Sequence, residues 1–103
     1  MMIFRILQIK DIEATDYAFR GYDENKFKLE DYEVKYCKET DAFDGKSDQE
    51  VLDFLFYIFN MAIPNDFEGH SLSMSDLVAL ESEGKVRLYY CDLCSWTLLE
   101  GVV

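Results

Sequence analysis

Apolar and polar positions along the chain predict strands in its first third. The opening MMIFRILQIK is an apolar run with two polar interruptions, which is typical of a strand covered on both faces and predicts one near residues 2–9. In DYEVKYCK, Tyr32, Val34 and Tyr36 alternate with polar residues. This period of two predicts a second strand, with these three side chains on one face.

The segment SDQEVLDFLFYIFNMAI predicts the main helix, near residues 48–62. Ser47 and Glu50 have the spacing of a capping box, and Asp48 adds negative charge where the helix dipole favours it. Pro64 ends the helix, since proline cannot continue the backbone hydrogen bonds.

Apolar side chains cover about 220 degrees of this helix, a wider arc than packing on one sheet face requires. The arc includes Phe54, Phe56 and Met61, and leaves Asp53 and a few others for water. Two interpretations remain: the helix is covered on two sides, or part of the arc contacts a partner. Plain burial is the favoured one.

The last third predicts a C-terminal antiparallel meander: DLVALE, a turn at SEGK, then VRLYYCD and SWTLLE. Residues 11–30 mix polar and aromatic positions, which fits a short helix or irregular turns that pack aromatic rings inward. Together these elements predict an α+β fold, in which a small antiparallel sheet packs against one main helix. We expect a single domain over residues 1–103.

Charge narrows the possible partners. The chain has 21 acidic and 10 basic residues, a formal net charge of −11. Such a protein is repelled by phosphate backbones and anionic membranes, so we expect no direct nucleic-acid ligand, no membrane and a basic protein surface as partner. No signal peptide or membrane span is visible, and three cysteines do not form a disulfide framework, which favours the cytoplasm.

The acids are concentrated in the middle of the chain. From Glu39 to Glu83 there are eleven acids and one base, Lys46. This acidic segment is either an ordinary solvated surface or a binding surface.

Candidate catalytic and metal-binding groups are weak. Cys91 and Cys94 have zinc-knuckle spacing but lack a second closely spaced pair. His70 has serines and Asp76 nearby, yet triad members converge from separate segments and no nucleophile elbow is present. We therefore predict no catalytic residues, no metal and no cofactor, with Gly69 and the polar residues around it serving backbone groups in turns.

The stretch DFEGHSLSMSDLVAL, followed by YYCD, closely resembles the signature of the YodL-like domain, a small module from Firmicutes and their mobile elements. The resemblance extends upstream through FRILQIKD, YAFRGYD, YEVKY and IFNMAIPNDF, and so covers nearly the whole chain. The chain departs from the family pattern in the acidic loop 41–48 and at residues 94–96, where glycine or an aromatic residue is expected.

Such domains are similar to proteins of phages, plasmids and conjugative elements, and no catalytic residues are established for the family. The resemblance and the charge imply a non-enzymatic inhibitor in a bacterial host cell, an anti-CRISPR protein that binds the type II effector nuclease and interferes with guide RNA loading. The alternative is a protein-interaction or scaffold module of a mobile element, as a monomer or a homodimer. Partner contacts are predicted at Asp41, Asp44, Asp48, Asp53, Asp66, Glu68, Glu81 and Glu83, with Phe54 and Phe56 as apolar anchors.

Overall fold

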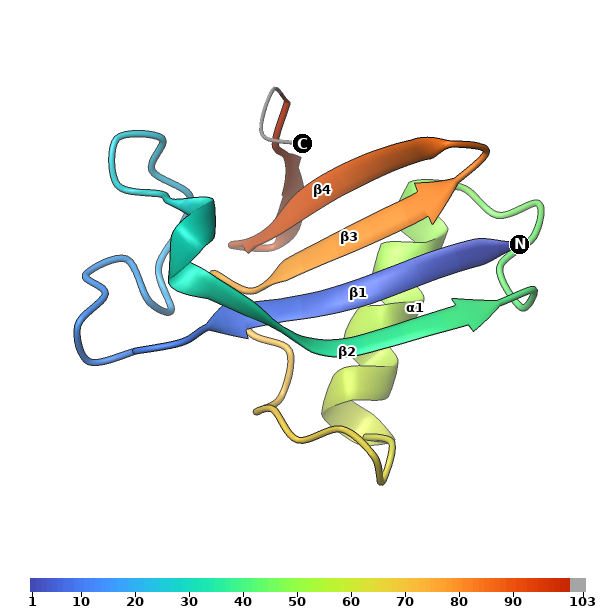
Figure 1. The fold of residues 1–103 in the computed structure, drawn as a ribbon, viewed down its shortest axis with the longest axis horizontal. Coiled ribbons are helices and arrows are strands. Elements are labelled where there is room, and N and C mark those ends of the chain that lie inside the picture. The colour runs from blue at the N-terminus through green and yellow to red at the C-terminus, as the bar shows by residue number, and fades with distance from the viewer. Residues whose placement is uncertain (101–103) are drawn as a thin grey trace.

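Residues 1–100 form a five-stranded antiparallel sheet with one α-helix packed on one face. Figure 1 shows this arrangement. The computed structural model describes residues 1–100; the end of the predicted domain, residues 101–103, lies outside the described residues. The strand order is β2-β1-β3-β4-β5, and the predicted α+β class is confirmed. The elements are β1 (Met2–Ile9), a 3₁₀-helix (Leu29–Asp31), β2 (Tyr32–Thr40), α1 (Asp48–Met61), β3 (Leu77–Ser82), β4 (Lys85–Asp92) and β5 (Ser95–Leu98).

The capping box begins α1 as predicted. The Ser47 hydroxyl accepts from the Glu50 amide and the Glu50 carboxylate accepts from the Ser47 amide, so two amides of the first turn are satisfied. Asp48 then ties this turn to β4: Arg87 donates to both carboxylate oxygens, at 2.8 and 2.9 Å, and the Tyr89 hydroxyl donates at 2.6 Å. The helix therefore starts beneath β4 and runs across the sheet towards β2 (Figure 1).

The core between α1 and the sheet is rich in aromatic rings. Phe59 lies at its centre, with ring centroids 4.9 Å from Phe67, 5.4 Å from Tyr36 and 6.3 Å from Phe4. Fully buried aliphatic side chains fill the rest of this core: Ile6, Val51, Leu52, Leu55, Leu72, Val78 and Leu80.

Residues 10–31 cover part of the opposite sheet face. They form turns and a short 3₁₀-helix, and bring Tyr17, Tyr22 and Phe27 onto the second core, against Tyr32 and Tyr90 of the sheet. The sheet thus carries apolar side chains on both faces along β1 and β3, which explains why the apolar run at the start of the sequence is interrupted only at Arg5 and Gln8.

The predicted common face of β2 is wrong at one residue. Ile6 pairs with Tyr36, whereas the next residue, Leu7, pairs with Val34, so Lys35 is an extra residue in β2. This bulge moves Tyr36 into the core beneath α1, while Tyr32 packs in the opposite core. A bulge of this kind is set by the pairing with β1 and leaves no mark on the alternation of β2 itself.

Replacing Ser47 with alanine tests the start of α1. We expect Ser47→Ala to lower the free energy of unfolding by about 1 kcal/mol, because the Glu50 amide loses its acceptor. Urea unfolding followed by circular dichroism measures this change. Ser71→Ala, at an exposed serine outside any helix, is the control and should change stability by less than about 0.5 kcal/mol; equal losses in the two variants would contradict the capping role.

Candidate protein-binding surface

The side of α1 that faces away from the sheet carries large apolar side chains in contact with water. Phe54 is 50% exposed, Phe56 43%, Tyr57 54% and Met61 76%. We call these four residues and Asp53 the outer face of α1. Burial of the whole apolar arc, the favoured interpretation of the sequence, is wrong for Phe54, Phe56 and Met61 because the sheet covers only one side of the helix, whereas Tyr57 and Asp53 lie outside that arc and are exposed as expected.

Two rings of the outer face are held by aromatic neighbours from other elements. Phe54 packs edge-on against Phe43 of the loop before α1, with centroids 5.7 Å apart. Phe56 packs edge-on against Trp96 of β5 at 6.5 Å. Supported in this way, both rings are pre-ordered and half-exposed, which is the property of an anchor residue in a protein interface.

The charge on α1 is entirely acidic, since the segment Asp48–Met61 contains no lysine or arginine. Asp48 is engaged with Arg87, whose hydrogen bonds lower the pKa of the carboxyl. Glu50 is engaged in the capping box, and its bonds from Ser47 lower its pKa. Within residues 1–100, Asp53 accepts a hydrogen bond from the neutral Gln49 amide at 2.8 Å and forms no ion pair, so it is an uncompensated acid among the exposed rings.

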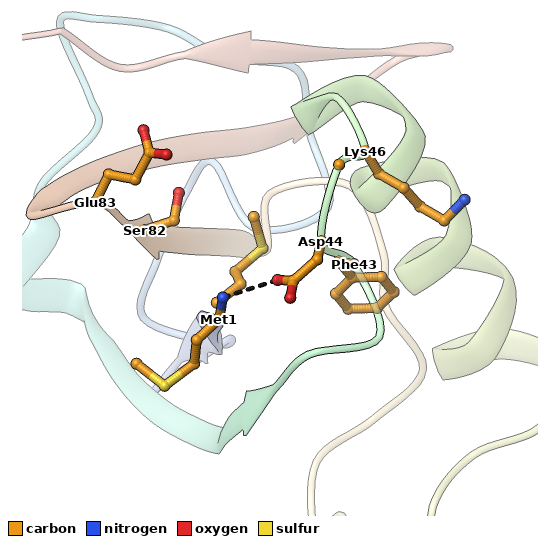
Figure 2. A pocket seen from close by; sticks show the side chains of 8 residues that line it. Met1, Phe43, Asp44, Lys46, Ser82 and Glu83 are labelled. Atoms are coloured by element: carbon orange, nitrogen blue, oxygen red, sulfur yellow. Dashed lines mark hydrogen bonds and ion pairs between the residues drawn. The ribbon is translucent and has the colours of Figure 1, made fainter.

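The predicted contact acids lie in separate places. Asp41, Asp44 and Glu83 lie at the end of the sheet where β1 begins, and Asp44 and Glu83 line an open hollow of about 550 Å³ (Figure 2). In this hollow the ammonium group of Met1 donates to Asp44 at 2.8 Å. Lys46 also lines it, so its charge is mixed.

The remaining acids divide between ion pairs and free carboxylates. Glu81 pairs with Arg5 at 2.9 Å, on the sheet face opposite α1, and Asp48 is bound as described. Asp66 and Glu68 are exposed in the segment that follows α1, where Asp66 accepts a long bond of 3.4 Å from the Tyr36 hydroxyl. Asp53, Asp66 and Glu68 therefore supply the negative charge on α1 and its continuation.

The signature segment around His70 is locked to β1 by one buried glutamine. The Gln8 amide nitrogen donates to the His70 carbonyl at 2.8 Å and to Asp76 at 3.0 Å, and its oxygen accepts from the His70 amide at 3.2 Å. Gly69 allows this contact: a Cβ there would lie 2.1 Å from the Gln8 oxygen and 2.7 Å from the Phe67 ring. Glycine at this position is required by close approach.

Two serines of this segment form hydrogen bonds with backbone groups. The Ser73 hydroxyl donates to the Ser71 carbonyl at 2.7 Å, and the Ser75 hydroxyl accepts from the Phe19 amide at 2.9 Å. Asp76 is 1% exposed and accepts from the Ser73 amide at 2.8 Å, while His70 lies 3.7 Å from its other oxygen. Of the groups that suggested hydrolysis from the sequence, His70, Ser73, Ser75 and Asp76 are engaged in holding the turn, and the Ser71 side chain is exposed.

Burial raises the pKa of the Asp76 carboxyl to about 7, against the opposing effects of the Ser73 amide, His70 and Gln8.

The three cysteines differ: Cys37 and Cys94 are exposed, whereas burial raises the pKa of Cys91 to about 12 and keeps it a thiol. Within residues 1–100, no three histidine, cysteine or acidic side chains are grouped so that they could hold a metal. No helix in this range is long and apolar enough to cross a membrane.

The supports of the outer face could not be identified from sequence. Phe43 and Trp96 meet α1 through contacts that depend on the whole fold, and neither has a distinguishing pattern around it. Only their aromatic character was visible.

Comparison with known proteins gives one match. A family model described as YodL-like domain matches residues 3–100, nearly the whole chain. No curated protein and no solved structure matches.

The buried carboxyl of Asp76 predicts a pH dependence of stability. Its pKa of about 7 in the folded state lies above the ordinary value of 3.8, so between these pH values the folded state holds a proton that the unfolded state has lost. The free energy of unfolding should therefore fall as pH rises from about 4 to about 7, by roughly 2 to 4 kcal/mol, and then level off.

Asp76→Asn should remove this part of the pH dependence, because the amide oxygen can still accept from Ser73 and Gln8 but no proton is exchanged. Urea unfolding at a series of pH values measures the slope. Asp53→Asn, at an exposed acid, is the control and should keep the native slope. A slope that Asp76→Asn leaves unchanged would show that other groups cause it.

Proposed function

The chain belongs to the YodL-like domain family, and we propose that it is an inhibitor that works by binding a basic protein through the outer face of α1, without catalysis. The observation that carries the proposal is the combination on this face of four exposed large apolar side chains with acidic charge and no base. Solvated helix faces are usually polar, so such exposure favours an interface.

The acids define the chemistry of the partner. Asp53 lies among the exposed rings, and Asp66 and Glu68 continue the charge beyond the end of the helix. The net charge of −11 attracts a basic surface from a distance, and the supported rings of Phe54 and Phe56 then contact apolar side chains on it. A groove that another protein uses for nucleic acid has this basic character.

A second copy of the chain is a poorer occupant of the same face. In a symmetric dimer through α1, the acidic helices of both copies would face each other, and α1 contains no base to compensate them. The alternative of a homodimeric scaffold module is therefore disfavoured by charge.

The specific target that we propose is the type II CRISPR effector nuclease of a bacterial host cell, with the inhibitor supplied by a phage or mobile element. Such nucleases hold guide RNA and target DNA in positively charged channels. Before the guide is loaded this channel is free of RNA, and an anionic protein can occupy it. The proposed inhibition is therefore interference with guide RNA loading.

Two triple charge-reversal variants test whether the acids of α1 and its continuation contact the nuclease. The variant Asp53→Lys, Asp66→Lys, Glu68→Lys should bind the guide-free nuclease about tenfold or more weakly, because attraction becomes repulsion at the contact. The control Glu13→Lys, Glu24→Lys, Glu30→Lys reverses three exposed acids in the segment before β2, and so changes the net charge equally. Biolayer interferometry near 0.15 M salt measures both; equal loss in the two variants would mean that net charge acts without a defined site.

Experiments with guide RNA test which assembly step is blocked and whether the protein acts without catalysis. Pull-down by the guide-free nuclease, and not by the nuclease with its guide, is the expected result. Absence of binding to either form would exclude this nuclease as the partner. Guide RNA that is shortened after incubation would overturn the non-enzymatic part of the proposal.

A further inference from the structure

The sheet ends at β2 before the helix beneath it ends. Phe59 of α1 contacts Tyr36 of β2, so the helix reaches this edge strand two residues before its last residue, Met61. Figure 1 shows α1 continuing past β2. From Phe59 to the cap residue Ala62 the axis advances about 4.5 Å, close to the spacing of about 4.8 Å between neighbouring strands. The overhang is therefore about as wide as one strand.

The outer edge of β2 is available for pairing. The strand has nine residues, and within the described part of the chain it pairs only with β1. A long unpaired edge presents backbone donors and acceptors to solvent, and extended peptides bind to such edges by strand addition.

A groove runs between this edge and the helix. It is a cavity of about 180 Å³, and a second hollow of about 230 Å³ continues it, sharing Ala42, Phe43 and Phe54. We call the two together the β2 groove. Its principal walls are Tyr36, Lys38 and Thr40 from β2, Phe54 and Ile58 from α1, and Pro64 beyond the helix.

Those β2 residues face the helix side because their partners on β1 do. Tyr36, Lys38 and Thr40 pair with Ile6, Phe4 and Met2, all of which belong to the core beneath α1. Alternate side chains of a strand added beside them would point into the groove, and the intervening ones would point to the other sheet face.

We propose that the β2 groove binds an extended segment of another protein, which adds as a sixth strand to the edge of β2. The segment carries an acidic side chain opposite Lys38 and apolar side chains two positions before and after it. This site shares Phe54 with the outer face of α1 but does not include Phe56 or Tyr57, and the proposal does not depend on the CRISPR nuclease.

The positive charge of Lys38 indicates which kind of segment binds in the β2 groove. Within residues 1–100 Lys38 forms no ion pair, and it lies at the middle of Tyr36–Thr40, the part of β2 that lines the groove. A second copy that paired antiparallel over Tyr36–Thr40 would place its own Lys38 directly opposite, and like charges at that position are destabilising. The other part of β2 is bordered by the segment after α1, where Asp66 accepts from Tyr36. A short peptide of a different protein, with an acidic residue flanked by apolar residues, places no like charge opposite Lys38 and needs to pair only with Tyr36–Thr40.

A library of random nine-residue peptides displayed on phage, panned against the full chain, tests the proposal. We expect enrichment of sequences with an acidic residue flanked by apolar residues two positions away on each side. Enrichment of no sequence, or of sequences without this alternation, would overturn it.

Two variants test whether a selected peptide binds in the β2 groove. Ala42→Trp fills the cavity from an exposed position, and Lys38→Glu reverses the selecting charge. Each should weaken binding of the synthetic peptide about tenfold or more by fluorescence polarisation, with an unchanged thermal unfolding midpoint. Tyr57→Ser, on the outer face but outside the groove lining, is the matched control and should bind normally. Loss with Tyr57→Ser and retention with Ala42→Trp would move the site to the outer face.

Backbone methylation tests strand addition itself. In an added strand, every second peptide amide points towards β2 and the others point to solvent. Methylation of one alternate set of amides in the selected peptide should therefore abolish binding, and methylation of the other set should be tolerated. Equal effects of the two sets would overturn pairing with β2.

Discussion

The bond between Asp48 and Arg87 ties the first turn of α1 to β4, at one end of the path that the helix takes across the sheet. Two charge-assisted hydrogen bonds and one from Tyr89 hold the first turn of α1 beneath β4. With that end held, the buried residues of α1 follow the strands across until Phe59 meets Tyr36 of the edge strand. Both candidate binding surfaces, the outer face of α1 and the β2 groove, follow from this placement, because a single helix exposes one side and overhangs one edge.

The apolar content of the chain is explained by two cores and one exposed helix face. Residues 10–31 use their aromatic rings to cover the second face of the sheet, so the apolar side chains of β1 and β3 are buried on both sides. No comparable segment covers α1 in the described chain. A chain that can bury rings with turns at one face, but leaves four large side chains of its helix in water at the other, has a surface that stability alone does not explain.

Sequence periodicity was sufficient to predict the strands and the helix, but not the contacts that each of them makes. The alternation and the capping box predicted the strands and α1 because these signals are local. The extra residue at Lys35 and the neighbours of Phe54 and Phe56 depend on partners distant in the chain. The width of the apolar arc indicated correctly that one sheet face was not enough to cover it, but the number of layers, which decides between burial and exposure, is a property of the whole fold.

The ion pairs of the protein leave three acids of α1 and its continuation uncompensated. Within residues 1–100, four of the ten basic residues form ion pairs with acidic side chains: Arg5 with Glu81, Lys26 with Asp16, Lys35 with Glu33, and Arg87 with Asp48. None of these pairs includes Asp53, Asp66 or Glu68. Self-repulsion among the remaining acids opposes the folded state. A basic partner removes this repulsion on binding, so the same unpaired charge that weakens the free protein strengthens the proposed complex, and stability and recognition are coupled through Asp53, Asp66 and Glu68.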